Sequence, residues 1–266
     1  MEKHVRSRFL ILATYILTIL VNASANLLPL NGKLSKDISD MYRNLFTPAS
    51  YTFSIWSLIY LLLAFYVGYM VIKKFNEEDE KHYQEIGLYF IASSIFNCLW
   101  IIAWHYNLIL ITLVLMALLF ISVGRIYVLV QRRKDLIPSI AFGIYYGWIS
   151  IATIANVAIF LTFMKFDGFG IEPRFWTVAT LILGFLIICA CSYKNKDPFY
   201  ILTGIWAYAG IFYEHIRFWK YAYPIVIQTI TVCVALMIVL CAFISYKRIK
   251  LYLDERKKEK TEVVTQ

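Results

Sequence analysis

The chain has 266 residues, of which 61% are hydrophobic and only 16% are charged. A soluble domain is about half apolar and about a quarter charged, so this composition excludes an ordinary soluble protein. The formal net charge is +9, but the basic residues flank long apolar runs, as they do beside membrane spans. We therefore predict an integral membrane protein that contacts lipid and binds no nucleic acid.

Eight apolar stretches follow one another along the chain, and most are long enough to cross a bilayer. About 20 helical residues cover about 30 Å of hydrocarbon. The predicted fold class is therefore all-α, a polytopic bundle of about eight transmembrane helices. The predicted spans are residues 8–30, 51–73, 86–105, 108–130, 138–164, 175–193, 199–216 and 223–246.

The first span permits two interpretations. A basic N-terminal segment precedes the apolar run 9–21, and the small residues Ala23 to Ala25 follow it, which is also the pattern of a cleaved signal peptide. Asn22 and Asn26 lie one helical turn apart and favour a retained helix with a polar interior face. Cleavage of the first span would leave an odd number of spans. A cleaved signal peptide stays open as the alternative interpretation.

Basic residues predict the orientation of the spans. With the N-terminus inside, 18 lysine and arginine residues lie on the side of both termini and 7 lie on the opposite side. Cytoplasmic segments of membrane proteins carry such an excess. We predict both termini in the cytoplasm and the plasma membrane of a bacterium as the location. Residues 31–50 are long enough to form a cap, and the tail 247–266 is expected to extend the last helix before a frayed polar end.

The cysteines do not indicate a disulfide framework or a metal site. They are expected to act as small packing residues, because all of them fall within apolar runs. No Gly-rich phosphate loop and no zinc-type spacing of Cys and His occurs in the sequence. The five are Cys98, Cys189, Cys191, Cys233 and Cys241.

Three of the predicted spans carry a stripe of aromatic and amide side chains. Residues three, four or seven apart share one face of a helix, so each stripe points to one side. The stripes consist of Phe53, Trp56 and Tyr60; of Asn97, Trp100 and Trp104; and of Tyr145, Trp148, Ala152 and Asn156.

Such a stripe has a structural and a functional interpretation. Asn and Trp side chains can bond to a neighbouring helix and hold the bundle together, for roughly 1 kcal/mol per bond. Three stripes together would instead line an apolar pocket with a few hydrogen-bonding groups, which suits a flat, mostly hydrophobic ligand. Ala152 lies between Trp148 and Asn156 and leaves room for a ligand or for a close helix.

The spacing of these residues resembles the TspO/MBR family, the tryptophan-rich sensory or translocator proteins. The family's fifth helix has the pattern Pro-Tyr-x-x-Trp-x-x-x-Ala-x-x-x-Asn, which residues 145–156 match from the Tyr onward. Its third helix has Asn-x-x-Trp, matched by residues 97–100, and its second has aromatic positions matched by residues 53–60. The loop before the second helix departs from the family pattern, because Phe46 stands where a Trp is expected and Pro48-Ala49 replaces Pro-Pro.

The resemblance covers about residues 8–164 and implies a five-helix bundle with a ligand cavity between its helices. It divides the chain into a TspO/MBR-like core at 1–165, three additional transmembrane helices at 166–246 and a basic cytoplasmic tail at 247–266. Family ligands include tetrapyrroles such as protoporphyrin, sterols and benzodiazepine-type drugs. A tetrapyrrole is therefore expected as a ligand and not as a resident cofactor.

The predicted function is to bind a planar hydrophobic ligand, tetrapyrrole- or sterol-like, as a sensor, regulator or carrier. The alternative is a facilitative permease for a small apolar or amphipathic solute. No Asp or Glu lies deep in a predicted span, which argues against proton coupling. The sequence has no Ser/His/Asp set, His-Glu-x-x-His motif or paired carboxylates, so we expect no conventional enzyme. The one enzymatic activity that the resemblance suggests is the breakdown of porphyrin, which is disputed for the family. The oligomeric state stays open, and a homodimer is one alternative.

Overall fold

The computed structural model describes residues 2–133 and 135–264, and this part of the chain is helical without any strand. The all-α prediction is therefore confirmed. Three short 3-10 helices, η1 (Leu30–Gly32), η2 (Ser50–Ser54) and η3 (Gly168–Gly170), lie in or next to the connections. The α-helices are α1 (Glu2–Leu27), α2 (Ser35–Met41), α3 (Ile55–Ile72), α4 (Glu77–His105), α5 (Ile109–Arg133), α6 (Leu136–Phe163), α7 (Pro173–Asn195), α8 (Pro198–Arg217) and α9 (Pro224–Val264).

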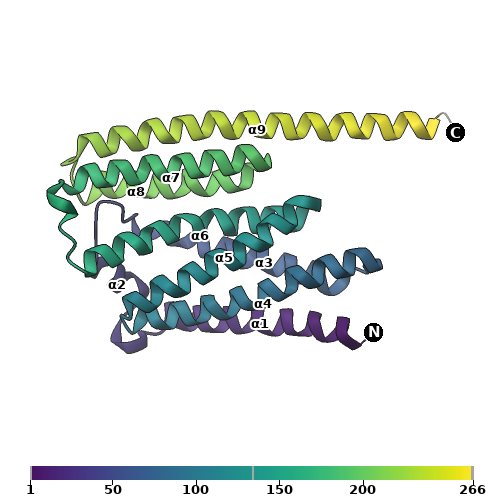
Figure 1. Ribbon diagram of the computed structural model, residues 1–266, viewed down its shortest axis with the longest axis horizontal. Helices are drawn as coiled ribbons and strands as arrows, with labels where there is room; N and C mark the ends of the chain where they lie inside the picture. Colours follow the sequence, from purple (N-terminus) through teal and green to yellow (C-terminus); the bar gives the residue numbers. More distant parts are fainter. Residues whose placement is uncertain (1, 134, 265–266) are drawn as a thin grey trace.

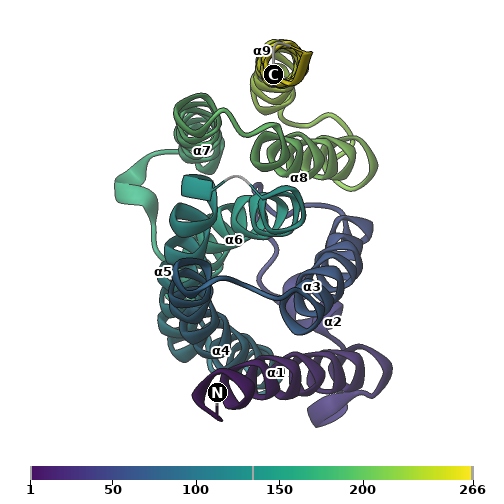
Figure 2. The same cartoon turned by 90° about the vertical axis from the view of Figure 1, so that its right-hand side faces the viewer.

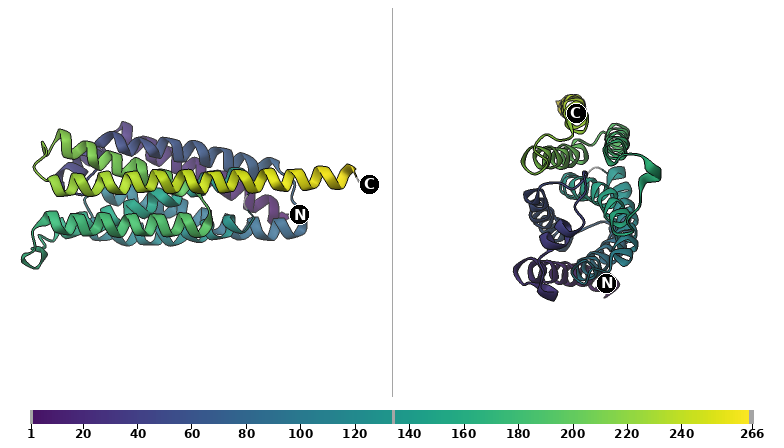
Figure 3. Two further views of the ribbon diagram at one scale, coloured as in Figure 1. Left: turned by 90° about the horizontal axis from the view of Figure 1, so that it is seen from above. Right: turned by 90° about the vertical axis from the view of Figure 1, so that its left-hand side faces the viewer.

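Five helices form a ring in the order α1, α4, α5, α6 and α3, and each packs against the next (Figure 2). α7, α8 and α9 form a second layer, in which α8 packs on α6 and α9 packs on both α7 and α8. Both termini lie at one end of the bundle, and α2 lies near the other end (Figure 1). We call these the terminal end and the cap end. Figure 3 shows the ring from the cap end and α9 extending past the other helices at the terminal end.

Seven helices of the described chain are long and apolar enough to cross a membrane. The predicted span at residues 199–216 forms α8, which does not reach the same hydropathy. Its side chains meet protein on several sides, and Tyr200, Tyr208 and His215 among them are fully buried. A helix covered by its neighbours needs less apolar surface than one that faces lipid. α8 nevertheless runs alongside the other long helices, which brings both termini to the same end (Figure 1).

Local sequence signals explain where several helices begin. Pro173 and Pro198 open α7 and α8 at positions where no backbone donor is needed. Asn76 caps α4, because its side chain accepts a 2.8 Å hydrogen bond from the N–H of Asp79. α4 therefore begins well before the predicted span at residue 86, since the apolar pattern detects only its membrane portion. α9 likewise continues through Val264, and residues 265–266 of the tail lie outside the described chain.

The interior of the ring differs along its length. Near the terminal end, the rings of Tyr66, Phe90 and Phe142 fill the space between helices. The Tyr66 ring centroid lies 4.8 Å from that of Phe142 and 5.5 Å from that of Phe90. Tyr66 and Phe142 are fully buried. The cap half of the ring is not filled in this way, and it contains the candidate site.

Candidate functional site

A cavity of about 590 Å³ lies in the cap half of the ring. α1, α3, α4 and α6 supply its walls, while α2 and residues 44–50 cover it, and Ala207 and Ile211 of α8 reach it from the second layer. Pockets that bind small molecules have volumes of roughly 300–1,000 Å³. The cavity is therefore large enough for a ligand of several fused or linked rings.

Most of the residues predicted for the site surround this cavity. Two do not reach it and lie directly behind its wall. The Tyr145 ring packs 6.1 Å from the Trp56 ring, and Oδ1 of Asn97 accepts a 2.7 Å hydrogen bond from Nδ2 of Asn22. The eight of ten that line the cavity are Phe53, Trp56, Tyr60, Trp100, Trp104, Trp148, Ala152 and Asn156.

Aromatic rings form a continuous wall on one side of the cavity. Trp56 stacks on Tyr60 with centroids 5.6 Å apart and meets Trp148 edge to face at 6.3 Å. It also lies 6.2 Å from Trp100, which in turn stacks on Trp104 at 5.8 Å. Rings held by other rings have little freedom to move, so this wall offers a rigid apolar surface to a flat molecule.

The amide side chains mainly bond to neighbouring helices. Nε1 of Trp100 donates to Oδ1 of Asn156 at 3.3 Å, which joins α4 to α6. Nδ2 of Asn156 donates to the backbone carbonyl of Ala152 at 2.9 Å. The bond between Asn22 and Asn97 joins α1 to α4 in the same way. The structural interpretation of the stripes accounts for these bonds, although Nδ2 of Asn97 is buried and has no partner among the described residues.

Trp148 differs from the other polar groups of the wall. Its Nε1 is buried and has no hydrogen-bond partner among the described residues. Of the side chains that line the cavity, Trp148 is the one with such an atom. A buried donor left without an acceptor costs about 1–3 kcal/mol. A ligand acceptor in the cavity would remove this cost.

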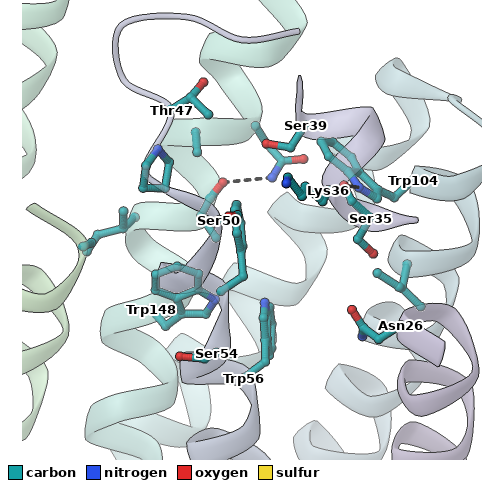
Figure 4. Close-up of a pocket in the computed structure, with 18 of the residues that line it drawn as sticks. Asn26, Ser35, Lys36, Ser39, Thr47, Ser50, Ser54, Trp56, Trp104 and Trp148 are labelled. Atoms are coloured by element: carbon teal, nitrogen blue, oxygen red, sulfur yellow. Dashed lines mark hydrogen bonds between the residues drawn. The ribbon is translucent and has the colours of Figure 1, made fainter. Parts of the chain in front are cut away.

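The cap contributes polar residues that the sequence analysis did not assign to the site. Figure 4 shows Ser35, Lys36 and Ser39 of α2 around the upper part of the cavity, and all three line it. The end of α4 holds this helix in place, since Nε1 of Trp104 donates to the carbonyl of Ser35 at 3.2 Å. Nε2 of His105 lies 3.3 Å from the Ser35 hydroxyl. The length of the segment indicated a cap, but no local pattern showed which of its residues point inward.

The chain matches the family model described as TSPO-like protein over residues 8–245. The match is longer than the region of resemblance at 8–164, and it includes α7, α8 and most of α9. No curated protein and no solved structure matches the chain.

Proposed function

The chain belongs to the family of TSPO-like proteins, and we propose that it binds a flat, mostly apolar ligand of tetrapyrrole or sterol type as a sensor, regulator or carrier. Family membership and seven long apolar helices make it an integral membrane protein. The observation that carries the ligand proposal is the unpartnered Nε1 of Trp148 in a cavity that has a wall of aromatic rings on one side.

The chemistry of the walls defines the ligand. Trp56, Trp100 and Trp104 present ring surface, which favours a molecule with an extended apolar face. Trp148 offers one hydrogen-bond donor, so the ligand carries an acceptor such as a ring nitrogen or a carbonyl oxygen at that point. One directional bond within an apolar pocket orients a ligand without adding much desolvation cost. No step of this proposal requires a catalytic residue.

The permease alternative has less support. Tyr66, Phe90 and Phe142 fill the ring beyond the cavity, on the side of the terminal end. A solute that crossed the bundle through the ring would have to displace these packed rings. The arrangement favours a pocket that approaches the cap end alone over a path that reaches both ends.

Quenching of tryptophan fluorescence by added protoporphyrin tests the proposal. Trp148→Phe keeps a ring and removes the donor, and we expect the affinity to fall about tenfold, as the loss of one buried hydrogen bond implies. Trp148→Ala should weaken binding further, because it also removes the ring. Trp176→Phe is the matched control, since Trp176 lies on α7 and its Nε1 already donates to the carbonyl of Gly168. Equal affinities in all four proteins would contradict the proposal.

A further inference from the structure

The loop of residues 43–52, which we call the cap-end loop, covers part of the cavity. Phe46 and Ser50 of this loop line the cavity, and Phe46 is only 3% exposed. Inside the loop, hydrogen bonds form only local turns: the N–H of Asn44 donates to Oγ1 of Thr47 at 3.0 Å, and the N–H of Thr52 donates to the carbonyl of Ala49 at 2.9 Å. Such turns do not fix the loop against the bundle, so other contacts must hold it in place.

These contacts come from α8, which lies outside the five-helix ring. Within the described part of the chain, every hydrogen bond that joins the cap-end loop to a helix distant in sequence goes to α8. Arg43 forms an ion pair with Glu214, and Nε2 of His215 bonds to the carbonyl of Leu45 at 2.9 Å. The N–H of Ala49 donates to the carbonyl of Gly210 at 3.1 Å. Nε1 of Trp206 donates to the carbonyl of Thr52 at 2.9 Å.

The α8 residues that make these contacts share one helical face. Trp206, Gly210 and Glu214 are spaced four apart, so they form a stripe along the helix. Tyr51 of the loop packs edge to face against the rings of Trp206 at 5.6 Å and Tyr213 at 5.5 Å. These edge-to-face contacts add ring packing to the hydrogen bonds between the loop and α8.

At Gly210, α8 approaches the loop closely. A Cβ atom at this position would lie 2.0 Å from Oγ1 of Thr52. Thr52 is fully buried, and its hydroxyl has no partner among the described residues. Any side chain at position 210 would therefore push the loop away from α8.

A polar recess shows where the cavity approaches the surface. The recess has a volume of about 150 Å³ and lies between α2, the cap-end loop and α8. Ser39 and Ser50 line both the recess and the cavity, whereas Glu214 and Arg217 line the recess alone. A solute that enters from the cap end would thus pass the edge of the loop that α8 holds.

We propose that α8 holds the cap-end loop closed over the cavity and thereby controls the access of solutes to it. The residues of the α8 stripe are positioning residues, because they touch the loop and not the ligand. A ligand that binds in the cavity, as the function proposed above requires, would enter and leave faster once these contacts are weakened.

A cysteine placed in the cavity reports access without any ligand. In the full chain with Ser57→Cys, the measurement is the rate of labelling by a water-soluble methanethiosulfonate reagent, and the parent chain gives the background from its own cysteines. Adding Gly210→Ala should raise the rate about tenfold, because the loss of one or two buried hydrogen bonds corresponds to about that factor. Gly204→Ala is the matched control on the same helix, since a Cβ there would meet Ile188 and Met237 instead.

A second change in the loop separates this role from a general loosening of α8. Thr52→Ala removes Oγ1 and Cγ2, the atoms nearest to position 210, and should bring the labelling rate of the Gly210→Ala protein most of the way back. Trp206→Phe is an independent variant that keeps the ring and removes the bond to the Thr52 carbonyl. It should raise the labelling rate about threefold.

Unchanged labelling rates in both Gly210→Ala and Trp206→Phe would overturn the inference. A rise in Gly210→Ala that Thr52→Ala does not reverse, or an equal rise in Gly204→Ala, would also overturn it. The proposed function is tested separately by the protoporphyrin titration of the parent chain. A parent chain that binds no protoporphyrin contradicts that function, while the labelling rates still decide whether α8 closes the cavity.

Discussion

The cap half and the terminal half of the five-helix ring are built from the same helices, yet one is hollow and the other is filled. In the cap half, small side chains such as Ala23, Ser57 and Ala152 face the centre, and the large rings lie along the wall. In the terminal half, Tyr66 and Phe142 occupy the centre. The size of the side chains that face the centre therefore distinguishes the hollow half from the filled half.

The two ends of the bundle are also closed differently. At the terminal end, the hydroxyl of Tyr83 bonds to Asp135 and lies 3.1 Å from the hydroxyl of Tyr69, which accepts a 2.7 Å bond from Nζ of Lys73. Charged side chains thus join the helices directly at that end. At the cap end, a separate helix and a loop cover the cavity.

Reporter fusions test which end of the bundle faces the cytoplasm. We expect each fused reporter to be either fully active or inactive in the cytoplasm. Asp167 lies in the connection between α6 and α7, and this connection is at the cap end (Figure 1). We expect cytoplasmic activity from a reporter at the C-terminus and none from one at Asp167, because most basic residues lie at the terminal end. Cytoplasmic activity at Asp167 would reverse the predicted orientation.

Phe142→Ala should have the largest effect on stability. Phe142 is fully buried in the filled half, and a Phe→Ala change in a packed core costs about 3–5 kcal/mol. Trp148→Ala removes a larger ring but enlarges a space that already exists, so its cost should be smaller. Denaturant unfolding in detergent micelles measures both values. An equal loss of stability would show that the halves are packed alike.

Two alanines on α6 allow the same change in each half. Ala141 is 1% exposed in the filled half, and Ala141→Leu should destabilise the protein by about 1–3 kcal/mol through overpacking. Ala152 lines the cavity, so Ala152→Leu should leave stability nearly unchanged but block protoporphyrin binding. Unfolding and fluorescence titration of both variants check the contrast. Unchanged binding in Ala152→Leu would mean that the cavity is not the binding site.

Asn76→Ala should have the smallest effect. Losing the cap of α4 at the terminal end costs about 1 kcal/mol of stability. Binding should not change, because changes at distant sites without shared partners act independently. Thermal unfolding and protoporphyrin titration of this variant measure the two effects. A fall in affinity would indicate that the terminal end and the cavity are coupled.

Helical spacing alone identified much of the aromatic wall of the candidate site. Trp56, Trp100 and Trp148 line the cavity together, because residues on one helical face stay together when the helix packs. Asn97 and Tyr145 do not line the cavity. Each lies three residues before a Trp that does, at the edge of its aromatic stripe. Whether a flanking residue reaches the centre depends on the rotation of its helix against its neighbours, which spacing does not specify.

The sequence by itself determined the helical class, the long apolar helices and the aromatic stripes, since bilayer thickness and helical periodicity act over short stretches of chain. Only the tertiary structure decided that α8 belongs to the site. Nε1 of Trp206 bonds to the carbonyl of Thr52 across 154 positions of sequence, and Gly210 makes room for that contact. No local pattern encodes such a pair, because the contact arises only when the second layer packs against the ring.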